Sequence, residues 1–140
     1  MLGHETIEKS YQTDWYSCGA HCAHMVLHHF GVRIRYSTVK AAVKTTPLVG
    51  TRLVDIQRFL RSKAFRVGHR EYFTLRQLEK VLRRDAVVIS PYSWNHVVVV
   101  HGVDREHVYI TDPRPLTASK VRRSRFSKVW GHCGLVIYPK

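Results

Sequence analysis

The sequence predicts an α+β domain, with helices first and an antiparallel sheet after them. In the first half of the 140 residues, apolar side chains recur at intervals of three and four, which is typical of amphipathic helices. In the second half, short runs rich in Val and Ile are separated by Pro, Gly and Asp, which is typical of strands and turns. No linker interrupts the chain, so we expect a single domain over residues 1–140.

Four helices are expected before the sheet. Gly31 would end the first of them in a left-handed conformation, and Ser37 would cap the second. Thr74 and Gln77 have the spacing of a capping box at the start of the fourth. The expected ranges are 18–30, a short helix from 37 that stops near 45–47, then 53–60 and 74–82.

Strands are expected over residues 86–92, 96–103, 108–112 and 133–138. The second and third would form a hairpin through a turn near residues 104–106. Residues whose numbers sum to about 208 or 210 would then lie opposite each other. In either register His96 and Asp112 lie on the same face of the sheet.

The charge balance is the outlying feature of the composition. The chain has 23 Lys and Arg against 10 Asp and Glu, a net charge of +13 with its 10 histidines neutral. Such a charge would attract an acidic peptide, an anionic membrane surface or nucleic acid. The basic residues are dispersed and no nucleic-acid-binding motif accompanies them, so an acidic peptide or protein partner is favoured over nucleic acid.

Other features exclude several classes of protein. No apolar run approaches the roughly 18 residues of a transmembrane helix, and no secretory signal is visible at the N-terminus. The three cysteines are odd in number and form no disulfide framework, which favours a reducing cytoplasm. The oligomeric state is left open.

Cys18 is the most informative residue, because it is expected in the first turn of a helix. The helix dipole and the free backbone N–H groups there favour a thiolate, which is the nucleophilic form of cysteine. The same N–H groups could face an oxyanion, and Gly19 would let a substrate carbonyl approach the backbone. Gln12, six residues upstream, could supply a further donor.

A thiolate nucleophile needs an imidazole base and a group that orients the imidazole. His96 is the best base, because it opens the strongest strand after the polar turn 93–95. Asp112, at the end of the next strand, is the expected orienting group. His101, on the opposite face of its strand, is the alternative base. Asp112 could instead only cap a turn before Pro113, which would leave a Cys–His dyad.

These residues resemble those of the bacteriocin-processing, double-glycine leader peptidases, which are papain-like cysteine peptidases. The resemblance implies that Cys18 attacks a peptide carbonyl, that His96 acts as general base and then acid, and that Asp112 orients His96. It also implies that Gln12 helps to form the oxyanion hole. It extends from Gln12 to about Val136 and rests on residues 12–22, Gly50-Thr51, 96–99 and Asp112-Pro113.

The chain departs from the family pattern in two respects. Ser17 stands where the family usually has an acidic residue, directly before the cysteine. Many members are the N-terminal domain of an export transporter, whereas this chain ends where such a domain would end, so the resemblance implies a stand-alone enzyme. Gly19, Gly50 and Asn95 are the expected substrate contacts, although Gly50 could equally be a plain turn residue. No metal or organic cofactor is expected.

The remaining cysteines and a histidine stripe are expected to have structural roles. Cys22 and Cys133 should be small buried side chains. His21, His24 and His28 share one helical face, but no CxxC pair, HExxH motif or second ligand cluster accompanies them. A solvated or partner-facing stripe is therefore favoured over a metal site.

The leading hypothesis is a papain-like cysteine peptidase that acts on a peptide or protein through an acyl-enzyme at Cys18. The basic surface is expected to surround the cleft and to select an acidic substrate. One alternative is a binding module of the same fold that holds nucleic acid or an acidic partner. Another is a papain-like toxin or acyltransferase that uses the same catalytic residues.

Overall fold

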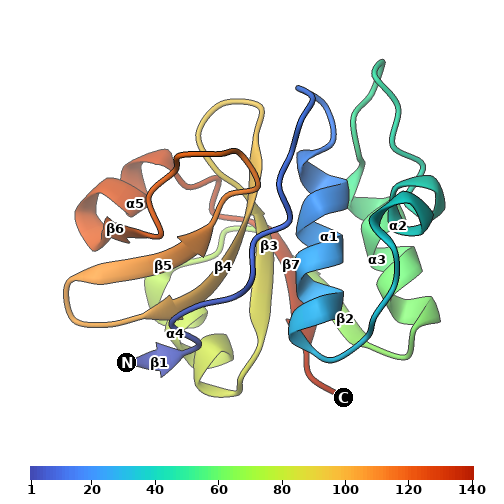
Figure 1. The fold of residues 1–140 in the computed structure, drawn as a ribbon. Helices are drawn as coiled ribbons and strands as arrows, with labels where there is room; N and C mark the ends of the chain where they lie inside the picture. The colour runs from blue at the N-terminus through green and yellow to red at the C-terminus, as the bar shows by residue number, and fades with distance from the viewer.

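A computed structural model describes all residues from 1 to 140 as an antiparallel sheet with helices on both faces (Figure 1). The helices are α1 (Cys18–His29), α2 (Tyr36–Ala42), α3 (Leu53–Ser62), α4 (Leu75–Arg83) and α5 (Arg123–Val129). The strands are β1 (Leu2–Gly3), β2 (Arg66–Arg70), β3 (Val87–Pro91), β4 (Val97–Val103), β5 (His107–Thr111), β6 (Lys120–Arg122) and β7 (Gly134–Tyr138). The strand order is β2-β7-β3-β4-β5-β6, and β1 pairs with β4. The predicted α+β class is confirmed, and none of the helices has the length and apolar content needed to cross a membrane.

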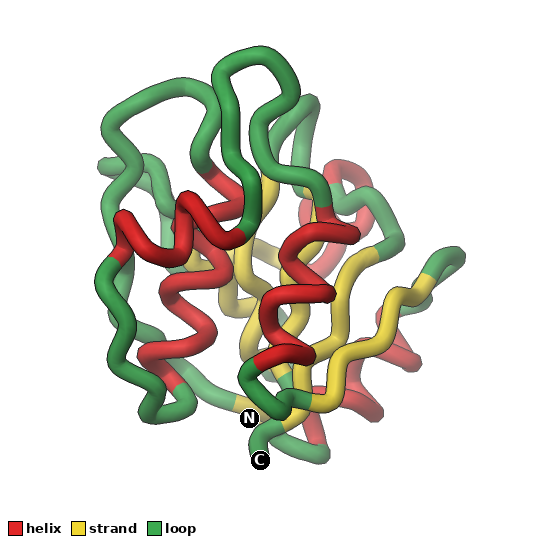
Figure 2. The backbone as a smooth tube through the Cα atoms, turned by 90° about the vertical axis from the view of Figure 1, so that its right-hand side faces the viewer, coloured by secondary structure: helices red, strands yellow, loops and turns green.

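The sheet separates two hydrophobic cores. Helices α1, α2 and α3 cover one face, while α4 and α5 cover the other (Figures 1 and 2). Alternate residues of the central strands therefore point into different cores: Ile89 and Val99 pack toward α1, and Val88 and Val100 pack toward α4. Burial of both faces explains why β3 and β4 are continuous apolar runs rather than alternating ones.

The predicted helix signals are mostly confirmed. Gly31 follows α1 with a φ of +83°, and the capping box joins Gln77 N to the Thr74 hydroxyl at 3.1 Å and Thr74 N to the Gln77 carbonyl oxygen at 3.0 Å. The predicted cap at Ser37 is wrong. Helix α2 already begins at Tyr36, after extended Arg35, and no side chain caps it.

Near residue 112, the β4–β5 hairpin has the predicted register in which the numbers of opposite residues sum to 210. Val99 lies opposite Thr111, and Val100 lies opposite Ile110. A bulge then shifts the pairing between Val100 and Gly102, toward the turn. The bulge lies closer to the turn than the Val99–Thr111 pair, so it does not change the pairing next to His96 and Asp112. These two residues therefore come together at one end of the sheet.

Residues 1–12 run along the molecule and tie the α1 face to β4. His4 N donates to His101 O at 2.7 Å, and His101 Nδ1 donates to His4 O at 2.7 Å. With Nδ1 carrying the proton, His101 Nε2 accepts from the Thr111 hydroxyl at 2.9 Å. This side chain is buried in structural hydrogen bonds near His29, at the end of α1 remote from Cys18, and it does not line the cleft described below.

The prediction that the histidines of α1 form a solvated or partner-facing stripe is also wrong. His21 is buried and stacks on Tyr36 with ring centroids 3.9 Å apart, and no cluster of side chains suited to a metal ion is present. His24 Nε2 donates to Ile34 O at 3.0 Å, so its Nδ1 accepts the Ser10 hydroxyl at 2.9 Å. Ser10 in turn accepts from His21 Nδ1 at 2.7 Å. The stripe is the contact surface of α1 with α2 and the N-terminal segment.

Buried neutral histidines make the fold sensitive to acid. Burial lowers the pKa of His101 to about 4, so the folded chain resists a proton that the unfolded chain accepts near pH 6.5. The free energy of unfolding should therefore fall as the pH drops from about 6.5 to 4, by up to about 3 kcal/mol for this residue. Urea unfolding of the wild type and of His101→Gln across this range should give a flatter pH dependence in the variant. The exposed His69 offers a control, because His69→Gln should keep the wild-type slope; equal slopes for all three proteins would contradict this account.

Candidate active site

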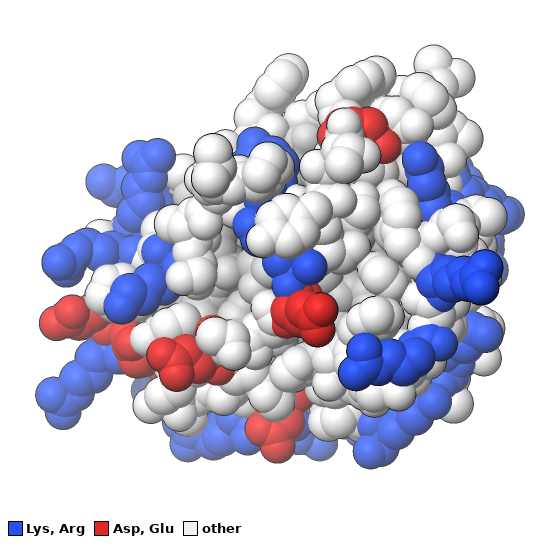
Figure 3. All heavy atoms as spheres, viewed as in Figure 1, with Lys and Arg blue, Asp and Glu red and all other residues white.

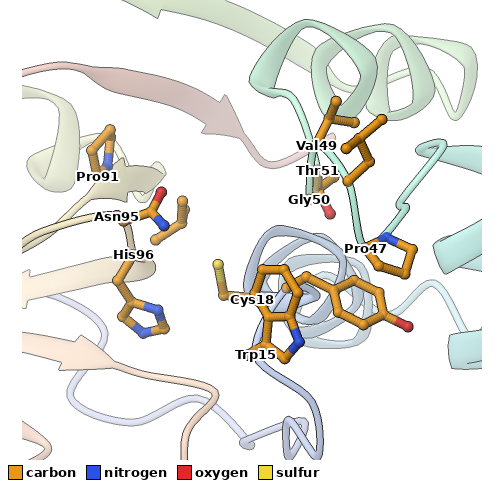
Figure 4. Close-up of a pocket in the computed structure, with 12 residues that line it drawn as sticks. Trp15, Cys18, Pro47, Val49, Gly50, Thr51, Pro91, Asn95 and His96 are labelled. Carbon is orange, nitrogen blue, oxygen red and sulfur yellow. The ribbon is translucent and has the colours of Figure 1, made fainter.

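A cleft of about 350 Å³ opens at the end of the sheet where α1 begins (Figure 4). One wall comes from the start of α1 and the tight turn at residues 46–50, and the other comes from the connection between β3 and β4. Cys18 and His96 both line this space. The lining residues are Trp15, Tyr16, Cys18, Pro47, Leu48, Val49, Gly50, Thr51, Pro91, Asn95, His96 and Val97.

Asp14 fixes the start of α1 and so the position of Cys18. Its carboxylate accepts from Tyr16 N at 3.0 Å and from Ser17 N at 2.8 Å. Ser17 is the N-cap residue but forms no side-chain cap. Asp14 thus holds the backbone of the two residues directly before Cys18. Cys18 begins the helix, where the first backbone N–H groups have no acceptor within the helix.

The three cysteines lie in different environments and form no disulfide. Cys18 is partly exposed in the cleft. Cys22 is buried, as predicted; its thiol donates to Val97 O at 3.5 Å, and burial raises its pKa well above the usual value. Cys133 is only half-buried, so the prediction of a core position is wrong for this residue, although burial still raises its pKa. Only the Cys18 thiol faces the cleft.

The turn before β4 directs His96 into the cleft. Ser93 and Asn95 have left-handed φ values of 59° and 54°, and Tyr92 N donates to His96 O at 2.9 Å. The His96 ring is buried, and its Nε2 donates to Asp112 Oδ1 at 2.6 Å. Its Nδ1 is therefore the ring nitrogen available to the Cys18 thiol, which lies across the cleft (Figure 4).

Opposing effects determine the pKa of His96. Burial lowers this pKa, but the hydrogen bonds with Asp112 and with Cys18 outweigh burial, so the pKa is raised above its ordinary value. The imidazolium form is thus stabilised by a carboxylate on one side and the sulfur on the other. An imidazole in this setting can hold the proton of a thiol.

Arg114 holds Asp112 in the charged form. The backbone N of Arg114 donates to Oδ1 at 2.9 Å, and its Nη2 donates to Oδ2 at 2.8 Å. Burial would raise the pKa of Asp112, but the hydrogen bonds from His96 and Arg114 hold it well below its usual range. Asp112 therefore caps the turn and also bonds the imidazole, so the alternative in which it only caps the turn and leaves a Cys–His dyad is wrong. Arg114 was not among the site residues expected from the sequence. Its position directly after Asp112-Pro113 was the one signal that could have indicated its contact with Asp112.

Gln12 is buried beside the Asp112 turn and does not line the cleft. Its backbone N donates to Pro113 O at 2.8 Å, which joins the N-terminal segment to the segment after β5. Its side-chain carbonyl oxygen is buried without a hydrogen-bond partner. An amide left in this state costs stability, which is typical of residues retained for function.

The three expected substrate contacts differ in position. Gly50 and Asn95 line the cleft, and Gly50 is also a turn residue, with a φ of +66°. Gly19 does not line it. A Cβ on Gly19 would lie 2.8 Å from Thr51 Cβ, so this glycine allows α1 to pack against the 46–51 segment. Its location contradicts the expectation that the missing side chain admits a substrate carbonyl.

No Lys or Arg lines the cleft, so its walls do not supply the positive charge that was expected to select an acidic substrate. The upper end of the molecule, where the cleft lies, is mostly neutral in Figure 3, while Lys and Arg gather on the flanks and along the lower rim. Large apolar side chains border the cleft instead, and Trp15 and Leu48 are 77% and 92% exposed. The walls of the cleft therefore present apolar and neutral side chains rather than Lys or Arg.

Comparison with known proteins agrees with this geometry. LagD of Lactococcus lactis subsp. lactis, a lactococcin-G-processing and transport ATP-binding protein, is 31% identical over 137 residues, which cover 93% of this chain. The chain spans only 18% of LagD.

Solved structures share the fold at lower identity. A double glycine motif protease from an AMS/PCAT transporter, solved with a leader peptide, has a TM-score of 0.81 at 20% identity and covers 99% of this chain and 95% of its own. The peptidase domain of Streptococcus ComA, a bi-functional ABC transporter, has a TM-score of 0.79 at 19% identity, with coverage of 98% and 100%. A putative C39-like peptidase from Bacillus anthracis has a TM-score of 0.77 at 16% identity, with coverage of 99% and 98%. A family model described as the Peptidase C39 family matches residues 6–140, and the chain therefore belongs to this family of cysteine peptidases.

Proposed function

We propose that residues 1–140 act as one catalytic domain that cleaves a polypeptide through an acyl-enzyme at Cys18. The observation that carries the proposal is the 2.6 Å bond from His96 Nε2 to Asp112, because it leaves the other ring nitrogen to the thiol. Membership of the Peptidase C39 family supports the reaction class. The cysteines are free and the reaction needs a reduced thiol, which favours a reducing compartment, the cytoplasm.

In the first half of the reaction, His96 Nδ1 takes the proton of Cys18, and the sulfur attacks the carbonyl carbon of the scissile peptide bond. The oxyanion that forms faces the free N–H groups at the start of α1. We assign Gln12 as a further amide donor near the oxyanion, on the basis of its burial beside the Asp112 turn and of the family resemblance. When the intermediate collapses, the imidazolium gives its proton to the leaving amine.

In the second half, His96 removes a proton from water, which attacks the thioester and releases the acid product and the Cys18 thiol. Asp112 remains a carboxylate throughout and orients the ring. If an amine replaced water in this step, the same residues would catalyse acyl transfer. Water is the smaller nucleophile and reaches an open cleft freely, so we favour hydrolysis.

The substrate class follows from the cleft and from the names of relatives. LagD is named for the processing of lactococcin G, and one solved relative is a double glycine motif protease seen with a leader peptide. We infer that this chain also cleaves a peptide after a pair of glycines. Small residues would fit where Gly50 and Thr51 approach Cys18, and Trp15 and Leu48 would contact apolar residues farther along the substrate.

Cleavage should depend on Cys18. Cys18→Ala removes the nucleophile, so the rate of cleavage of a Gly-Gly-containing leader peptide should fall on the order of 10⁴-fold or more. Mass spectrometry of the products gives both the rate and the cleaved bond. Cys133→Ala, a matched loss of a half-buried thiol outside the cleft, should keep wild-type cleavage. Undiminished cleavage by Cys18→Ala would overturn the proposal.

Thiol accessibility should differ among the three cysteines. Iodoacetamide should label Cys18 first, because this thiol is exposed to the cleft and lies beside an imidazole that can take its proton. Cys133 should react more slowly and Cys22 slowest, since burial raises the pKa of both. Peptide mapping against time measures the three rates. Similar rates at all three positions would count against Cys18 as nucleophile.

The charge of Asp112 should control the titration of His96. Asp112→Asn removes the carboxylate that outweighs the effect of burial, so the pKa of His96 should fall below its wild-type value. The imidazolium would then be lost at a lower pH than in the wild type. NMR of ¹⁵N-labelled histidine follows this titration, with Asp104→Asn, on the distant β4–β5 turn, as the control. A His96 midpoint that is the same in Asp112→Asn and wild type contradicts the assigned role.

A further inference from the structure

A second concave surface lies at the α4 side of the sheet, away from the catalytic cleft. It encloses about 590 Å³ between α4, the end of β2 and the end of β7. None of its lining residues also lines the cleft. Its cationic residues are Arg70, Arg76, Lys80, Arg83 and Arg84, and together with Tyr138 they define what we call the basic groove.

The positive charge of the basic groove is not neutralised within the chain. None of its five cationic side chains takes part in an ion pair. Glu79 is the one carboxylate residue in the lining, and its Oε1 already accepts from Arg123 Nη2. The groove therefore has an excess of cations without partners.

The spacing of these cations on α4 is unfavourable for the helix alone. Arg76, Lys80 and Arg84 follow one another at intervals of four, so they lie on one face. Like charges at this spacing destabilise a helix, and the one carboxylate in the lining, Glu79, is already bonded to Arg123. An anion bound between Arg76, Lys80 and Arg84 would be attracted to each of them and would offset their mutual repulsion. Anion binding would therefore explain why the three cations are placed on one face.

Aromatic rings hold several of the guanidinium groups in place. The guanidinium carbon of Arg66 lies 4.1 Å from the centroid of Tyr138, and that of Arg84 lies 5.2 Å from the same centroid. Arg70 lies 5.5 Å from the centroid of Phe73. Such stacking restricts the arginine side chains while their N–H groups can still donate, so less side-chain entropy is lost when a ligand binds.

The same stacking indicates which class of anion fits. Nucleic-acid sites for single strands combine cations with aromatic faces on which bases stack. Here the Tyr138 ring is occupied by arginines and Phe73 is buried, so the groove offers no such face. Carboxylates need only the N–H edges, which guanidinium groups bind in bidentate pairs. A groove of this volume holds a few residues of an extended chain.

We propose that the basic groove is a second binding site, separate from the catalytic cleft, for an acidic stretch of a polypeptide. This site accounts for the distribution of charge, because the cleft itself has no cation besides its histidine. It does not depend on the peptidase reaction, so either proposal can fail alone. A partner or substrate with an acidic segment would be held at α4 while its remaining chain stays free to move.

Fluorescence anisotropy with a short fluorescein-labelled oligoglutamate peptide tests the proposal. The wild type should bind the peptide at low salt and lose affinity steeply at physiological ionic strength. Arg76→Glu/Lys80→Glu/Arg84→Glu should weaken binding by about tenfold or more, since each reversal replaces an attraction with a repulsion. The milder Arg76→Gln/Lys80→Gln should weaken it by about threefold, which keeps the test valid if the triple variant folds poorly.

A matched charge control separates the groove from the net charge. Arg33→Glu/Arg35→Glu/Lys44→Glu makes the same change in net charge at exposed positions beside α2, on the face of the sheet opposite α4, and should alter affinity by less than about twofold. Cys18→Ala should bind like the wild type. Equal losses in the control and groove variants would overturn the proposal, as would an unlabelled single-stranded oligonucleotide that binds the groove more tightly than the glutamate peptide.

Discussion

The buried hydrogen bond between His96 Nε2 and Asp112 Oδ1 is the interaction on which the catalytic account depends. It selects the ring nitrogen that meets Cys18 and keeps a charged carboxylate next to a ring whose pKa burial alone would lower. Its geometry follows from the β4–β5 register, which brings the two residues to one end of the sheet. Arg114 completes the arrangement by holding the carboxylate from the solvent side.

The fold places most Lys and Arg side chains away from the lining of the catalytic cleft. The cleft lies where the sheet and the start of α1 meet, and its lining is apolar or neutral except for His96. The cations lie on the flanks and on α4, where the basic groove is found. A charge of +13 would by itself suggest electrostatic selection at the catalytic site. In the function we propose, shape and apolar contact select the substrate at the cleft, and electrostatic attraction acts at the basic groove.

Local signals account for what the sequence could predict. Helix periodicity located α1 and Cys18 at its start, the Thr74 capping box located α4, and β-branched runs located the central strands. Edge strand β2 was missed because it is polar and pairs with the distant β7, and β6 was missed because it is polar and only three residues long. The roles of Gly19 and of the α1 histidines were wrong because they depend on contacts with Thr51 and Ser10, which no local pattern encodes.

The central claim is that His96, held by Asp112, activates Cys18 for attack on a carbonyl. The most direct test is the rate at which an activated ester of a Gly-Gly-terminated peptide acylates Cys18 in a single turnover, followed by intact-protein mass spectrometry. Loss of general base catalysis in His96→Ala should slow this step by about 10²- to 10⁴-fold, while Cys18 remains the site of acylation. Equal acylation rates in His96→Ala and the wild type would contradict the account.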